Sequence, residues 1–293
     1  MDSHCMFTDL TYVPLPDLLY DSSANLPLEG VNRLHQPLLV EPIHRSEFVG
    51  SLNRYFRSHR EAILPAVASD LLVEVTDYIL QCSPINEGVI GDPHCSCFVE
   101  WFVLDLVNSV QEGVYRDPSM KWRRLCGVNW LKQVWSTFIL TDELSIRAAM
   151  IVLPPEILSP EVFATLATWS SDKLRRQSHH FPSILQRLEG RVSPTESIWA
   201  MLLSVCTALK CPRFILSTFN EWSFGSFDSE FTQVRVTGVI KHCSIEPTVF
   251  QMVVACSSFD EWDYYLRPSK YAPSITVEDR MQNLTVDIDG VHI

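Results

Sequence analysis

The feature that most restricts the fold of this chain is a pair of apolar segments separated by a short turn. Gln133–Leu140 is apolar, aromatic and β-branched, and Ser145–Leu153 is apolar almost throughout before it ends at Pro154 and Pro155. Such residues favour strands, and the turn residues Thr141–Glu143 between them predict a hairpin. A strand that is apolar on both faces must be covered on both faces. We therefore expect a sheet with helices packed on each side.

The rest of the second half alternates between helical and strand patterns. Ser193, Pro194 and Glu196 form a capping box with proline at the first helical position, and a Ser-Pro-Glu sequence at Ser159 starts another helix. Three strands and a last helix follow at Arg213–Phe219, Trp222–Phe227, Phe231–Ile240 and Glu246–Phe259. The order β-β-α-α-β-β-β-α predicts an α/β fold with a mixed central β-sheet flanked by helices.

Four segments differ in pattern along the chain. Residues 1–42 are rich in Pro and Leu without periodicity, and we interpret them as an extended N-terminal arm. Residues 43–115 carry apolar side chains at helical spacing and predict a mainly helical N-terminal cap. The α/β core then spans 116–262. Residues 263–293 have the composition of a weakly ordered C-terminal tail.

The net charge of the chain indicates which classes of partner it can bind. Lys plus Arg number 23 and Asp plus Glu number 35, which gives a formal net charge of -12. Nonspecific nucleic-acid binding needs a basic surface, because the phosphate backbone is densely negative. Two basic clusters, Lys121–Arg124 and Lys173–Arg176, could form a local patch, but we interpret them as a strand edge and a solvated helix face. We therefore expect no nucleic-acid partner.

The sequence also indicates the cellular compartment of the chain and whether it binds a cofactor. The N-terminus lacks a basic stretch followed by an apolar one, and no apolar run approaches the ~20 residues of a membrane span. We expect a soluble chain without a membrane partner, in the cytoplasm or nucleus, with its nine cysteines reduced. His94–Cys97 could supply three metal ligands, but structural zinc takes four. We expect no cofactor.

The second half resembles a known family. The segments that carry the resemblance are Arg213–Thr218, Trp222–Phe227, Val234–Ile240 and Pro247–Gln251. In order and spacing they look like the restriction-endonuclease-like, PD-(D/E)XK type domains of mushroom-forming fungi, some of which sit beside fungal-type protein kinases. The resemblance covers roughly residues 95–260 and is clearest over 193–257.

The resemblance implies a catalytic hairpin whose chemistry is absent here. In active members one strand begins with an acid, and the next carries an acid and a lysine two residues apart, so that both face one side of the strand. The acids hold a divalent metal that activates water. The matching positions are Thr137 (or Ser136), Ile151 and Leu153, and no acid-x-Lys pair occurs from 134 to 160. The resemblance therefore implies a degenerate, non-catalytic domain.

Three functions remain open from the sequence. The first is an interaction or scaffold protein that binds an unknown protein partner. The second is a metal-dependent nucleic-acid hydrolase with displaced carboxylates, for which Glu100, Asp142, Glu143 and Glu156 are the candidates. The third is an accessory protein of a fungal biosynthetic gene cluster.

Overall fold

The structure is a computed structural model that describes part of the chain in detail. The described residues are 15, 39–59, 70–71, 96–115, 120–125, 135–142, 145–169, 193–241, 252–253 and 256–257. The strands are β1 (Leu39–Ile43), β2 (Lys121–Arg124), β3 (Ser136–Thr141), β4 (Ile146–Val152), β5 (Arg213–Ser217), β6 (Glu221–Phe227), β7 (Gln233–Thr237) and β8 (Ile240–Lys241). The helices are α1 (Arg45–His59), the π-helix η2 (Val99–Leu104), α4 (Asp105–Tyr115), α5 (Pro160–Leu166) and α8 (Pro194–Ala208).

The strands form one mixed sheet. Its order is β1-β7-β6-β5-β4-β3-β2, and β8 pairs with β6. The pairs β1·β7 and β4·β5 are parallel, whereas the other neighbours are antiparallel. The expected hairpin of two apolar strands is β3 and β4, which pair from Ser136 opposite Val152. The predicted α/β class with a mixed sheet is confirmed.

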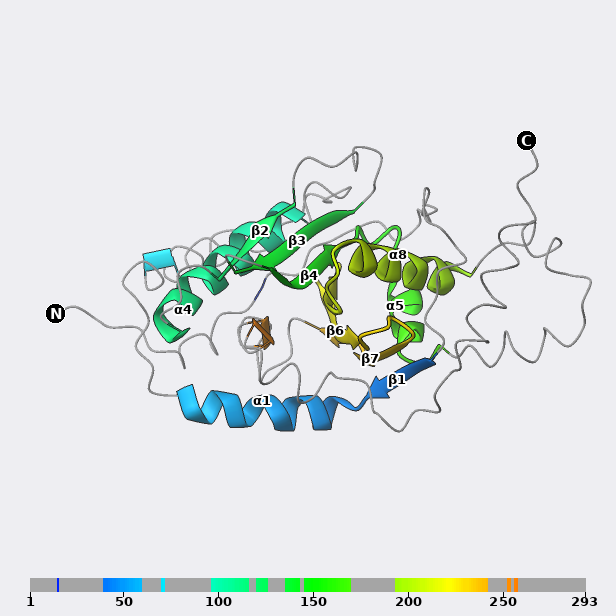
Figure 1. The fold of residues 1–293 in the computed structure, drawn as a ribbon, viewed down its shortest axis with the longest axis horizontal. Coiled ribbons are helices and arrows are strands. Elements are labelled where there is room, and N and C mark those ends of the chain that lie inside the picture. Colours follow the sequence, from blue (N-terminus) through cyan, green and yellow to red (C-terminus); the bar gives the residue numbers. More distant parts are fainter. Residues whose placement is uncertain are drawn as a thin grey trace, which may run out of the picture.

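Helices cover both faces of the sheet, which explains why β4 is apolar throughout. Ala149 and Ile151 belong to an apolar cluster with α5 and α8, whereas Met150 and Val152 belong to a second cluster with α1, η2 and α4. Successive side chains of a strand point to opposite faces, so each alternate residue of β4 faces one of these two clusters. Figure 1 shows α5 and α8 together on one side, away from α1 and α4.

Local sequence signals start the helices of the second half. The backbone N–H of Ser193 donates a hydrogen bond of 3.1 Å to Glu196 Oε2, and Pro194 occupies the first turn of α8. Ser159 Oγ accepts from the backbone N–H of Val162 at 3.4 Å and caps α5. Side-chain oxygens at these positions satisfy N–H groups that have no partner within the helix. Both predicted helix starts are confirmed.

The N-terminal arm and cap differ in part from the expectation. Leu39–Ile43 forms β1, which pairs in parallel with β7, so the predicted boundary at residue 42 falls inside a strand of the sheet. Local periodicity does not predict this pairing, because the partner strand is almost two hundred residues away. Within 43–115, α1, η2 and α4 are helical, as are residues 70–71, and the other residues between 60 and 95 lie outside the described part. The tail 263–293 lies outside it as well.

No helix in the described part of the chain is both long enough and apolar enough to span a membrane.

Candidate functional site

The three positions that the resemblance aligns with the nuclease motif lie on one face of the sheet. Thr137 of β3 lies directly opposite Ile151 of β4 in the antiparallel register. Leu153 follows β4, and its backbone N–H donates to the carbonyl of Ser217 at 2.9 Å. Thr137 is 7% exposed, and Ile151 and Leu153 are fully buried. The hairpin geometry expected from the resemblance is present, with buried side chains at all three positions.

The surroundings of these positions are apolar. Ile151 and Leu153 pack in the cluster formed with α5 and α8, which includes Phe163, Leu166, Ile198, Trp199 and Leu202. Magnesium and manganese require oxygen ligands in a near-octahedral arrangement. Two aliphatic side chains supply none. The residues at the motif positions therefore do not fit the metal that the resemblance implies.

Glu100, the first candidate for a displaced acid, lies on the other face of the sheet. Its Oε2 is 3.6 Å from Arg124 Nη1, and Arg124 Nη2 donates to Ser96 Oγ at 2.9 Å and to Ser136 Oγ at 3.0 Å. Ser136 and Thr137 are consecutive in β3, so their side chains point to opposite faces. The carboxylate of Glu100 is therefore separated by the sheet from the motif positions.

Asp142 closes the β3–β4 turn. Its carboxylate accepts hydrogen bonds from the backbone N–H of Ser145 at 2.7 Å and from Ser145 Oγ at 3.2 Å, and it forms an ion pair with Arg147. These contacts are those of a turn-stabilising Asp, since its side chain bonds the backbone three residues on. The second turn candidate, Glu143, lies outside the described residues.

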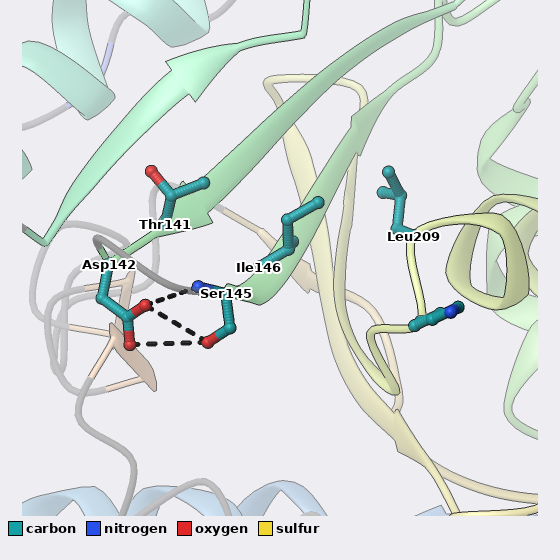
Figure 2. A pocket seen from close by; sticks show the side chains of 6 residues that line it. Thr141, Asp142, Ser145, Ile146 and Leu209 are labelled. Atoms are coloured by element: carbon teal, nitrogen blue, oxygen red, sulfur yellow. Dashed lines mark hydrogen bonds between the residues drawn. The ribbon is translucent and has the colours of Figure 1, made fainter.

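A surface pocket of ≈ 440 Å³ borders this turn. Its lining comprises Thr141, Asp142, Ser145, Ile146, Leu209 and Lys210. Figure 2 shows the carboxylate of Asp142 directed towards Ser145. The lining holds one carboxylate, and that carboxylate is engaged within the turn. The pocket does not offer the paired acids that metal-dependent hydrolysis needs.

Glu156 lies at the opposite end of β4 from Asp142. Asp142 precedes this seven-residue strand and Glu156 follows it. A strand rises ~3.3 Å per residue, so the two carboxylates are roughly 20 Å apart along the strand direction. Glu156 is only 6% exposed, and its Oε2 has no hydrogen-bond partner among the described residues. The displaced acids that can be located thus occupy three separate places.

The described part of the chain contains no group of three His, Cys, Asp or Glu residues that could hold a metal ion. Of the predicted metal-ligand segment His94–Cys97, His94 and Cys95 lie outside the described residues, and Cys97 is a free thiol. Cys206 and Cys211 are also free thiols and are buried, and Cys256 is buried as well. Burial raises the pKa of Cys211 to about 11, and burial also raises the pKa of Cys206 well above its ordinary value. Thiols with raised pKa are poor nucleophiles, which argues against cysteine catalysis at these two positions.

Glu221 is a buried acid that the sequence analysis did not single out. It begins β6, is 7% exposed, and its Oε2 has no hydrogen-bond partner among the described residues. Burial raises its pKa, the charge of Lys241 on β8 lowers it, and that of Glu161 raises it. The sequence pattern predicts that Asn220 and Glu221 form a tight hairpin turn between two strands. The burial of Glu221 follows from the pairing of β6 with β8, which local sequence does not reveal.

Trp101 is the second residue that the sequence analysis missed. It lies on η2 and is 59% exposed, and among the described residues it is the only large hydrophobic side chain that is exposed. The apolar residues of this helix recur at i+4 steps from Phe98 through Phe102 and Leu106, and Trp101 lies off that face. An aromatic residue outside the buried stripe was therefore a signal in the sequence for an exposed contact residue.

Comparison of the chain with protein-family models, with curated proteins and with solved structures gives no match in any of the three.

Proposed function

We propose that this chain is a non-catalytic, nuclease-like domain that acts as an interaction or scaffold protein. The observation that carries the proposal is the pair Ile151 and Leu153, both fully buried where a nuclease needs an acid and a lysine. Thr137, directly opposite Ile151, replaces the remaining acid. A divalent metal at this place would meet a threonine hydroxyl and two aliphatic side chains, which cannot complete its coordination.

The alternative of a hydrolase with displaced acids has no support in the arrangement of those acids. Glu100 pairs with Arg124 on one face of the sheet, while Asp142 and Glu156 lie beyond opposite ends of β4. Two-metal and one-metal hydrolysis both need carboxylates that converge on one ion or on neighbouring ions. Nothing in the described residues brings these three together.

A protein partner is supported by the surface around η2. Trp101 is 59% exposed and follows Glu100, whose carboxylate lies near Arg124 of β2. Tryptophan and arginine are the side chains that most often dominate the energetics of protein interfaces. We infer that this surface, formed by Trp101 and the Glu100–Arg124 pair, contacts the partner in the cytoplasm or nucleus.

The non-catalytic part of the proposal is tested by thermal unfolding with and without millimolar Mg²⁺ or Mn²⁺. A site filled at a hundred times its Kd would stabilise the fold by about 2.7 kcal/mol, a shift of several degrees. We expect no shift, and no cleavage of single- or double-stranded DNA. A melting temperature that rises with metal in the wild type but not in Glu156→Gln would instead identify a displaced metal site and overturn the proposal.

The interaction part is tested by affinity capture with Trp101→Ala. The side chain is mostly exposed, so we expect the free energy of unfolding to change by less than about 0.5 kcal/mol. Proteins that bind the wild type should be lost or strongly reduced with the variant. Ser109→Ala on α4 is the matched control, because this exposed hydroxyl bonds only within its own helix in the contacts described here, to Asp105 O at 3.0 Å. Equal capture by wild type and Trp101→Ala would exclude this surface as the contact.

A further inference from the structure

The end strand β2 has an unusual neighbour on the side away from β3. The backbone N–H of Trp122 donates to Asn108 Oδ1 at 2.7 Å, and Asn108 Nδ2 donates to the carbonyl of Trp122 at 3.0 Å. Asn108 belongs to α4, and Trp122 lies in the middle of β2. One side-chain amide thus reproduces both hydrogen bonds that a residue of a further strand would make with Trp122.

The register of the sheet shows which side of β2 this amide occupies. Among the described strands, β2 ends the order of the sheet and pairs only with β3, with Trp122 opposite Leu140. In an antiparallel pair, residues alternate between those that exchange hydrogen bonds with the partner and those whose N–H and C=O point away. Since both backbone groups of Trp122 bind Asn108, Trp122 is of the second kind. A further strand would need the outward-pointing N–H and C=O of Trp122 as hydrogen-bond partners.

The rest of Trp122 is held firmly on the core side. Its side chain is 3% exposed, and Nε1 donates to Ser257 Oγ at 3.1 Å. Ser257 Oγ in turn donates to the carbonyl of Val253 at 2.7 Å. The residue therefore cannot rotate its peptide away from Asn108 without breaking buried contacts. The Asn108–Trp122 pair is a fixed part of the fold.

The opposite end of the sheet is also unsuited to a further strand. β1 contains Pro42, which has no N–H to donate. Proline within a sheet is confined to edge strands for this reason. Unprotected edges offer rows of unpaired N–H and C=O groups that promote pairing with other chains.

We propose that Asn108 is an edge lock, which occupies the outward backbone groups of Trp122 in the middle of β2 and prevents a second copy of this chain from adding its own β2 to the sheet. The second copy is the occupant that the geometry favours, because identical edges can pair antiparallel about a twofold axis. The lock also implies that a partner of this domain binds through side chains rather than by strand addition at β2.

The test is Asn108→Leu, which removes both hydrogen bonds and keeps a side chain of similar size. Sedimentation velocity over a wide concentration range should show self-association of the variant beyond that of the wild type. Hydrogen exchange at low concentration should show the Trp122 amide exchanging about tenfold faster or more. Ser109→Ala, at the next position of α4, should match the wild type in both measurements.

Two further measurements keep the proposal open to refutation if Asn108→Leu folds poorly. Asn108→Asp retains the acceptor for the Trp122 N–H, so we expect the Trp122 amide to stay protected in this variant. In the wild type itself, the Trp122 amide should be protected although β2 is an end strand. A fast-exchanging Trp122 amide in the wild type would overturn the proposal, as would an Asn108→Leu protein that sediments like the wild type at every concentration.

Discussion

The apolar surroundings of Ile151 allow a quantitative prediction. This side chain is fully buried between β4 and the helices α5 and α8. Replacing it with Asp removes the buried aliphatic atoms, which costs about 2–5 kcal/mol, and places an unpaired polar group in an apolar cluster, which costs about 2–7 kcal/mol more. The expected loss is on the order of 4–12 kcal/mol, against a total stability of about 5–15 kcal/mol for an ordinary domain. Ile151→Asp should therefore be largely unfolded.

Urea unfolding followed by tryptophan fluorescence measures this loss. Ile151→Val is the matched control, with an expected cost of about 0.5–1.5 kcal/mol and an unchanged m-value. The reasoning would be refuted if Ile151→Asp lost less than about 1 kcal/mol, since such tolerance is typical of exposed positions. It would also be refuted if Mg²⁺ restored the stability of Ile151→Asp. That result would mean that the position borders a polar cleft able to bind metal.

Three further predictions follow from buried positions elsewhere in the sheet and in α8. Gly225→Ala should cost about 1–3 kcal/mol in urea unfolding, because a Cβ there would lie 2.3 Å from Phe214 Cζ. Burial raises the pKa of Glu221 above its ordinary 4.5, so the folded state holds this proton more tightly than the unfolded state. The free energy of unfolding should therefore fall as pH rises from 4.5 through the raised pKa, and Glu221→Gln should reduce that fall. The prediction would be contradicted if the free energy of unfolding changed equally between pH 4 and pH 8 in the wild type and in Glu221→Gln. Cys206 and Cys211 should resist a thiol reagent at pH 8 in the native protein and react once it is unfolded, as followed by mass spectrometry; rapid native labelling would show that they are accessible.

The sequence was informative where neighbouring residues decide the structure. The unbroken apolar run of β4 predicted a strand covered on both faces, and the Ser193–Glu196 capping box predicted the start of α8. The absence of an acid at Ile151 and of a lysine at Leu153 is likewise a property of the sequence. The i+4 pattern of η2 and α4 also left Trp101 outside the buried stripe. These signals are local, since they depend on propensity, capping and periodicity over a few residues.

The tertiary structure decided the features that depend on distant pairings. It placed β1 beside β7, buried Glu221 through the pairing of β6 with β8, and joined Asn108 to Trp122. It also placed Glu100 on the other side of the sheet from Thr137 and Ile151. The physical reason is that the side-chain pattern of a strand shows which faces are buried but not which strand lies next to it. Strand neighbours depend on the packing of the whole sheet, so the candidate residues could be named from the sequence, whereas the side of the sheet on which Glu100 lies could not.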